Sequence, residues 1–265
     1  MPVQSSWWAN KMSTLVICIL IFILFMAAGF AGLLLQKRLT DDHKTGESKG
    51  VVGQVSGLVT LLLALVLGTL IGVSFAYYSS QKTNLENFSA QILRLDQALA
   101  QYGPETKPLR DKIKAGIVKG YETFWGGGDV DPKALTVEVP LANAQAISDF
   151  LVTLQPKTDA QKAALATANQ YSSMVEQSRL LISLQVASGP VSGVLIAILV
   201  FWTAALFFGI GLYAEPNALV YAALAFGALS IAFAIFLIFE FGMPFTGLYR
   251  VSPAALEQAI EFVDK

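Results

Sequence analysis

Residues 51–78 read VVGQVSGLVTLLLALVLGTLIGVSFAYY and contain no charged side chain. A helix rises about 1.5 Å per residue, so about 20 apolar residues cross the roughly 30 Å hydrocarbon core of a bilayer. This stretch therefore predicts a membrane-spanning helix. Apolar stretches of similar length lie at residues 14–35, 191–213 and 217–241, where Glu240, near the end of the last one, is the charged exception. The sequence predicts four spans, each helical because backbone groups in lipid must be satisfied within the segment.

The composition agrees with a membrane protein. Of the 265 residues, 54% are hydrophobic and 14% are charged, and the mean hydropathy is +0.57. A soluble domain carries about 25% charged residues. The formal net charge of −1 offers no basic excess for nucleic acid. The single cysteine, Cys18, can form neither an internal disulfide nor a cysteine metal cluster. We therefore expect no metal site and no nucleic-acid partner.

Enzyme signatures are missing from the sequence. There is no G-x-x-x-x-G-K-[ST], H-E-x-x-H or C-x-x-C motif. The one histidine, His43, lies among charged loop residues and cannot supply a multi-histidine site. The spans also lack the ionisable groups that pumps and proton relays place at membrane depth. We expect neither an enzyme nor a coupled pump, and no cofactor, which leaves a passive channel or a scaffold.

Two short connections predict how the spans pair. Residues 36–50 join the first two spans and residues 214–216 join the last two, so each pair forms a hairpin. We expect an all-α membrane protein with four transmembrane helices in two hairpins and a helical extramembrane domain between the second and third. The expected divisions are the amino-terminal transmembrane hairpin (1–78), the helical extramembrane domain (79–190), the carboxy-terminal transmembrane hairpin (191–241) and the carboxy-terminal tail (242–265).

The orientation follows from positive charge in the short segments. The loop at residues 36–50 carries four Lys or Arg residues, whereas Lys11 is the one basic residue before the first span. Short loops rich in Lys and Arg stay in the cytoplasm. The middle domain is therefore expected outside the cytoplasm.

The middle segment is polar but patterned. Apolar residues three and four apart form a heptad-like seam after the second span: Leu85, Phe88, Ile92, Leu95, Leu99 and Tyr102. This seam predicts that the second span continues as a helix that packs against partners. Gly103-Pro104 should end that helix, and helices are expected near 109–124, 142–154 and 158–187, the last continuing into the third span. The loop beginning at Gly126-Gly127-Gly128, with Asp129 and Asp131, is interpreted as a solvated turn rather than a calcium site.

Small residues follow one face of the second span. They are Gly57, Ala64, Gly68, Gly72 and Ala76, with Gly53 preceding them. One interpretation is close helix–helix packing of the small-xxx-small kind. The other is a pore-facing stripe whose small side chains leave room for ions. Both interpretations require partners for this helix. Glu240 is expected to be hydrated at the end of its span.

Nearly the whole chain, from about Leu35 to Ile260, carries short motifs in a fixed order. They are Ala64-Leu65-Val66-Leu67-Gly68 with Ile71, Leu95-Asp96, Tyr102-Gly103-Pro104-Glu105, Arg110, Phe201-Trp202, Gly211-Leu212-Tyr213, Asn217-Ala218, Glu240, Pro244-Phe245, Gly247 and Val251-Ser252. In this order they resemble the bestrophin-like family of bacterial membrane domains.

The resemblance implies a bacterial inner-membrane protein with distant similarity to bestrophins, which are pentameric anion channels whose second span lines the pore. Gly242 departs from the family pattern, which has an aspartate two residues before Pro244. No acidic run follows Gly247, so the calcium gating of bestrophins is not expected here.

Two functions remain open from the sequence. The first is a homo-oligomeric ion channel, conducting anions, with the second span lining the pore. The second is a membrane scaffold or accessory protein whose helical domain binds a partner protein. The small-residue stripe, the uncharged spans and the family resemblance motivate the first. The heptad-like seam and the absence of ionisable pore groups motivate the second.

Overall fold

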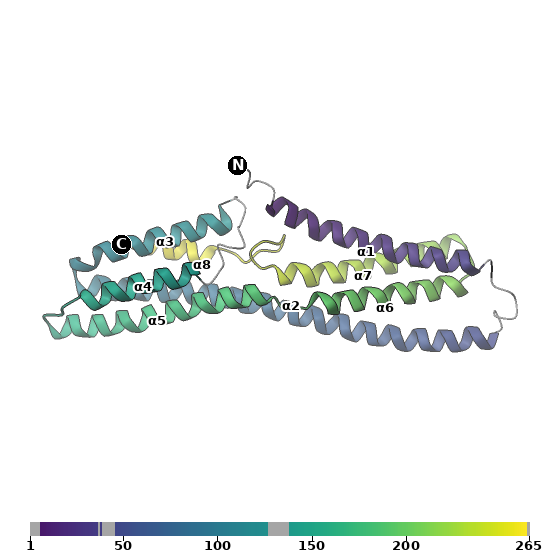
Figure 1. Ribbon diagram of the computed structural model, residues 1–265, viewed down its shortest axis with the longest axis horizontal. Helices are drawn as coiled ribbons and strands as arrows, with labels where there is room; N and C mark the ends of the chain where they lie inside the picture. Colours follow the sequence, from purple (N-terminus) through teal and green to yellow (C-terminus); the bar gives the residue numbers. More distant parts are fainter. Residues whose placement is uncertain (1–5, 37, 39–45, 127–137, 264–265) are drawn as a thin grey trace. The chain divides into compact units, whose positions relative to one another are not determined.

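The computed structural model describes residues 6–36, 38, 46–126 and 138–263, and every regular element among them is helical (Figure 1). The all-helical prediction is confirmed for this part of the chain. Residues such as His43, Asp129 and Asp131 lie outside it. The helices are α1 (Ser6–Gln36), α2 (Gly46–Tyr102), the 3-10 turn η2 (Pro104–Thr106), α3 (Lys107–Trp125), α4 (Glu138–Thr153), α5 (Asp159–Ser188), α6 (Gly193–Tyr213), α7 (Ala218–Gly242) and α8 (Ala254–Phe262).

The chain divides into two compact units, which are described separately. Asn10–Tyr77 and Pro190–Met243 form the span unit. Tyr78–Gly189 and Pro244–Lys265, grouped with Met1–Ala9, form the second unit, which we call the pocket unit after a cavity described below. The helix α2 contributes residues to both units, because it runs without interruption from Gly46 to Tyr102.

The span unit contains four helices that are long and apolar enough to cross a membrane, as the sequence predicts. They are α1, the first part of α2, α6 and α7. Their shared core is apolar and includes Phe25, whose ring stacks on Phe207 with centroids 5.6 Å apart. Asn217 begins α7 as its N-cap, since its Oδ1 accepts a hydrogen bond from the Val220 amide at 2.9 Å. The pairing of these helices as two membrane hairpins stays a prediction.

A close backbone crossing joins α1 to α6. A Cβ atom on Gly32 would overlap the carbonyl oxygen of Phe208, and a Cβ on Gly211 would overlap the carbonyl oxygen of Gly29. Small residues allow helices in lipid to approach this closely, where van der Waals contact provides the attraction. The sequence analysis assigned the small-residue role to α2 and missed this crossing, although Gly29, Gly32 and Gly211 are visible in the sequence as small residues within apolar spans.

The pocket unit has its own apolar core, which includes most of the seam on α2. Ile92, Leu95 and Leu99 are buried against side chains of α3, α5 and α8. The prediction that α2 continues to a break at Gly103-Pro104 is confirmed. The inference that the seam packs against partner proteins is wrong for the described residues, because the chain's own helices fill it. A heptad-like pattern alone does not tell intramolecular packing from assembly.

The predicted continuation of α5 into the third span is also wrong. The helix α5 ends at Ser188, and Gly189 follows with a φ of 60°, in the left-handed region. Pro190 has no backbone N–H to continue the ladder. A new helix, α6, starts at Gly193, and its N-cap Ser192 accepts a hydrogen bond from the Val194 amide at 3.3 Å. The apolar pattern predicted one continuous helix, but the backbone break at Gly189 and Pro190 separates α5 from α6.

Candidate functional site

The predicted small-residue stripe lies on the exposed side of α2 within the span unit. Gly57, Ala64, Gly68, Gly72 and Ala76 are all exposed. A Cβ atom on Gly57, Gly68 or Gly72 would meet no atom of another helix within 4 Å in the described part of the chain. The stripe therefore packs against none of the described residues, and its small side chains are open to lipid, water or another molecule.

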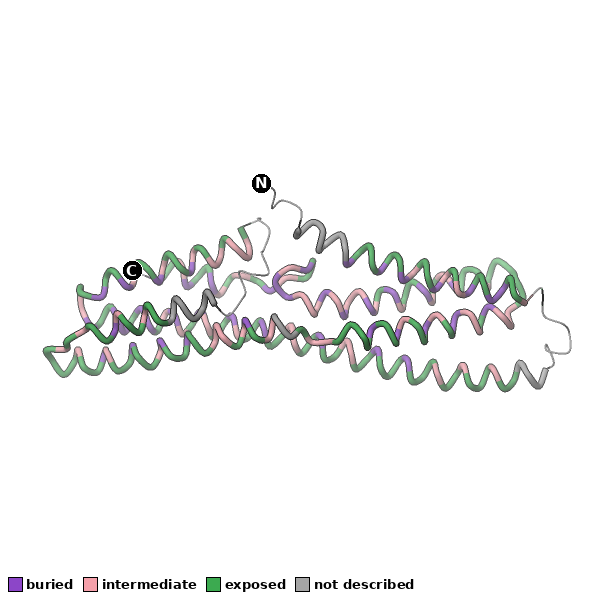
Figure 2. The backbone as a smooth tube through the Cα atoms, viewed as in Figure 1, coloured by how far each residue is buried: buried purple, intermediate pink, exposed green. Residues whose placement is uncertain are grey.

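The opposite side of α2 attaches the helix to the span unit. Leu63, Leu67 and Ser74 are buried, and the two leucines join the apolar core of that unit. Only 17% of the most apolar window of α2 is buried, compared with 22–28% for the other spans. Figure 2 accordingly shows exposed residues along most of this part of α2. The second span is the one that the chain itself covers least.

The stripe is interrupted by one large side chain. Leu61 continues the four-residue spacing from Gly57 and is 70% exposed. Thr60 and Thr69 donate their hydroxyl protons to the carbonyl oxygens of Ser56 and Leu65 in the preceding turn, at 2.7 and 2.8 Å. The stripe is therefore apolar and uncharged, and large apolar side chains such as Leu58 and Leu65 are exposed beside its small residues.

The family motif around residues 95–110 forms a structural joint in the pocket unit. The Arg110 guanidinium donates two hydrogen bonds to the carboxylate of Asp96, Nε to Oδ1 at 2.7 Å and Nη2 to Oδ2 at 2.9 Å. The two side chains are only 14% and 8% exposed. This fork-to-fork geometry is the strongest form of a side-chain ion pair. It fixes α3 against the end of α2.

The turn between these helices explains the motif Tyr102-Gly103-Pro104-Glu105. Gly103 has a φ of 135°, which side-chain-bearing residues rarely adopt. The hydroxyl of Thr106, whose side chain is buried, lies 2.6 Å from the carbonyl oxygen of Leu99 and satisfies the end of α2. Gln161, in the first turn of α5, donates from Nε2 to the Tyr102 carbonyl at 3.1 Å. Glu105 is exposed. These residues shape a turn, and no ligand role is evident for them.

The motif after the fourth span is divided between the two units. Glu240 belongs to the span unit and is only 3% exposed, so the expectation that it is hydrated is wrong. A Cβ on Gly242, the position where the family has aspartate, would contact the ring of Pro190 at 3.4 Å. Pro244, Phe245 and Gly247 are buried in the pocket unit.

The segment from Pro244 to Val263 is bound to α3 within the pocket unit. Trp125 Nε1 donates to the Val251 carbonyl at 3.0 Å, and Lys114 Nζ donates to the Val263 carbonyl at 3.1 Å. The rings of Phe124 and Phe245 contact each other with centroids 5.6 Å apart. The segment expected as a tail is part of a packed helical unit.

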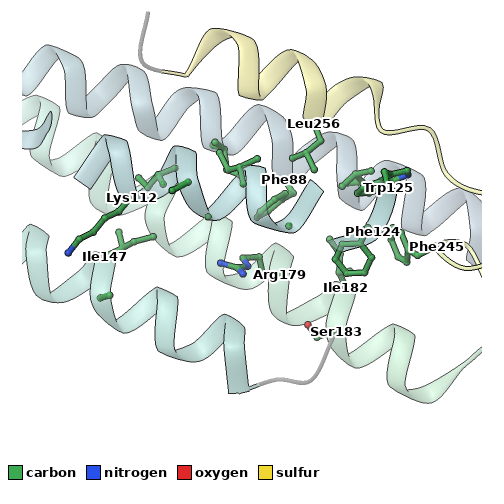
Figure 3. A pocket seen from close by; sticks show the side chains of 18 of the residues that line it. Phe88, Lys112, Phe124, Trp125, Ile147, Arg179, Ile182, Ser183, Phe245 and Leu256 are labelled. Atoms are coloured by element: carbon green, nitrogen blue, oxygen red, sulfur yellow. The ribbon is translucent and has the colours of Figure 1, made fainter. Parts of the chain in front are cut away.

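The pocket unit also contains a cavity that the sequence analysis did not find. Its volume is about 410 Å³, and most of its lining is apolar (Figure 3). Arg179 of α5 lines it, and burial lowers the pKa of this guanidinium. An arginine in an amphipathic helix ordinarily lies on the solvated face. The position of Arg179 between Glu176 and Ile182 was therefore the one feature of the sequence that could have pointed to this cavity.

The fold and these motifs define the class of protein to which the chain belongs. With four helices able to cross a bilayer, the chain is a multi-pass membrane protein. The Bestrophin-like domain family matches residues 23–256, which is most of the chain. The protein belongs to the Bestrophin-like family, as the motifs in the sequence predicted. No curated protein and no solved structure matches the chain.

Proposed function

We propose that the protein is a homo-oligomeric, anion-conducting channel in which α2 of each copy lines the pore. The observation that carries this proposal is the exposed face of α2, where Gly57, Gly68 and Gly72 contact no other helix among the described residues. Small, uncharged residues in a span leave space for ions when several copies surround an axis. Membership of the Bestrophin-like family supports a channel-like role, and five copies are expected by analogy with bestrophins.

The topology in the proposal follows the sequence pattern. The span unit crosses the bacterial inner membrane as two hairpins, and the pocket unit is the extramembrane domain. The charged loop after α1 faces the cytoplasm, which places the pocket unit outside the cytoplasm. Glu240, near the end of α7, is the one Asp, Glu, Lys or Arg residue in stretches 14–35, 51–78, 191–213 and 217–241, so conduction is passive.

The scaffold hypothesis has lost one of its two motives. The seam of Leu85, Ile92 and Leu99 is buried within the chain, so it offers no open surface to a partner protein. The absence of enzyme motifs in the sequence supports a transport role over catalysis.

Anion flux into liposomes tests the proposal. The purified protein is reconstituted, and chloride, nitrate and iodide fluxes are measured against empty liposomes. Gly68→Leu should abolish most of the flux, because the larger side chain enters the pore or separates the α2 helices. Gly209→Leu is the matched control, since a Cβ on Gly209 of α6 also meets no atom of another helix within 4 Å in the described part of the chain.

The outcomes separate the alternatives. Flux above background that falls with Gly68→Leu and survives Gly209→Leu supports a pore along α2. Flux that survives Gly68→Leu with assembly intact excludes the stripe as the permeation path. No flux for any of the three anions, from a protein that is oligomeric in mild detergent, refutes the channel and returns the function to a scaffold.

A further inference from the structure

The cavity of the pocket unit has the dimensions and lining of a ligand site. Its volume of about 410 Å³ lies within the range of about 300–1,000 Å³ that is typical of small-molecule pockets. Its walls come from α2, α3, α4 and α5, together with Phe245 and Leu256 of the carboxy-terminal segment. Most of these side chains are aliphatic or aromatic. Lys112, Ala115 and Ala146 are exposed, so the cavity reaches the surface.

One end of the cavity is strongly apolar. Phe124 and Trp125 of α3 meet Phe245 there, with ring centroids 5.6 and 6.1 Å from that of Phe245. Leu85 and Phe88 of α2 continue the same wall. Such a surface has no hydrogen bond to offer a polar ligand, but it favours an aliphatic chain by about 25 cal/mol per Å² of buried apolar area.

The guanidinium of Arg179 supplies a charge within this apolar lining. Figure 3 shows its side chain extending from α5 into the space that the other labelled residues surround, whereas Lys112 extends outward. Arg179 makes no hydrogen bond or ion pair with the side chains that the structure describes, which are those of residues 14–36, 38, 50–126, 145–186 and 189–263. Arg179 is half-buried, and burial of a charge without a partner has a free-energy cost that an anionic ligand would reduce. The hydroxyl of buried Ser183 also lines the cavity.

We propose that this cavity binds a single-chain anionic amphiphile, a long-chain carboxylate, with its head group on Arg179 and its aliphatic chain against Phe88, Phe124 and Phe245. Carboxylate geometry matches the guanidinium, which donates two parallel hydrogen bonds to it. The apolar walls and the opening at Lys112 complete the match of charge and surface. The site is separate from the α2 stripe and does not depend on the channel proposal.

Photolabelling of the full chain in nanodiscs tests the site. The probe is hexadecanoate carrying a diazirine, and labelled peptides are mapped by mass spectrometry. Labels on α1, α6 and α7 report partition into the bilayer, so they serve as an internal reference. Labels on α3 and α5 should be displaced by unlabelled hexadecanoate, but not by hexadecanol, which lacks the charge, or by butanoate, which lacks the chain.

Two variants and one control identify the recognition groups. Arg179→Met should reduce labelling of α3 and α5 by about tenfold or more, since it removes a charge-assisted pair. Its melting temperature should not fall, because the lost charge had no partner among the described residues. Gly120→Leu should also abolish labelling, since a Cβ there meets open space in the cavity lining. Arg94→Met, an exposed arginine on α2 outside the cavity, should leave labelling unchanged.

The proposal is overturned by any of three results. Equal displacement by hexadecanol and hexadecanoate would show that the charge is not recognised. Unchanged labelling in Arg179→Met would remove the guanidinium from the site. Absent labelling of α3 and α5, combined with loss of oligomers in Gly120→Leu, would show that a second copy of the chain fills the cavity.

Discussion

Replacement of Asp96 by asparagine should weaken the pocket unit more than any comparable surface change. The substitution keeps the shape of the side chain and removes the charge that faces Arg110. The Arg110 side chain, which is only 14% exposed, then remains in a site built for a bidentate partner without that partner's charge. Removal of one partner of a buried pair costs about 3–5 kcal/mol.

The partial exposure of Arg110 places the expected loss at the lower end, about 3 kcal/mol, because solvent screens part of the charge. For a chain of this size, 1 kcal/mol changes the melting temperature by about 2–4 °C. Asp96→Asn should therefore lower the melting temperature by about 6–12 °C. The assay is thermal unfolding of the detergent-solubilised full chain, followed by tryptophan fluorescence.

Asp111→Asn is the matched control. Asp111 lies on α3, next to Arg110 in the sequence, and its carboxylate pairs with Lys107 at 3.4 Å while both side chains are more than half exposed. Exposed pairs contribute about 0–1 kcal/mol. A double variant, Asp96→Leu with Arg110→Met, should recover most of the stability, since apolar residues of similar volume replace buried pairs at little cost. The reasoning is refuted if Asp96→Asn and Asp111→Asn unfold within 2 °C of each other, or if the double variant is as unstable as the worse single variant.

Two further substitutions test the glycines that the structure singles out. Gly32→Ala should destabilise the chain by about 1–3 kcal/mol, because the added Cβ overlaps the backbone of α6. Gly68→Ala should cause no loss of stability, because its Cβ meets open space. Equal melting temperatures for the two variants would contradict the close α1–α6 crossing. Gly103→Ala should cost about 1–3 kcal/mol through its φ of 135°. An added Cβ at Gly103 would also lie 2.6 Å from Glu105 Oε2. If the double variant Gly103→Ala with Glu105→Ala regains the stability, the loss comes from that contact and not from the backbone conformation.

The spans and most helix ends were predictable because they depend on local signals. An uncharged stretch such as residues 51–78 is decided by composition alone. Gly103-Pro104 ends α2 because glycine adopts the positive φ and proline lacks a backbone N–H, and both properties can be read from the residue types. The helix expected near 142–154 is observed as Glu138–Thr153, a small difference at its start.

The errors arose where a residue's role depends on what lies across from it. The seam of Leu85 and Leu99 reads the same whether a partner protein or α3 fills it. Glu240 looked hydrated because it ends an apolar run, yet neighbouring segments of the span unit bury it. The role of Arg179 was not predicted because it depends on a cavity to which four other segments contribute, and no local sequence pattern carries that information.

The continuity of α2 restricts how the length of this chain can vary. Leu85 and the other seam residues define the buried face of the helix in the pocket unit, and Leu63 and Leu67 define its buried face in the span unit. Leu67 and Leu85 are 18 residues apart, which is five whole turns, so the two faces lie on the same side of the helix. Each residue inserted or deleted between Leu67 and Leu85 turns one face relative to the other by about 100°. Only changes close to whole numbers of turns, about 7 or 11 residues, keep both faces in phase. Relatives that share both cores should therefore keep the number of residues between these leucines constant, or change it in those steps.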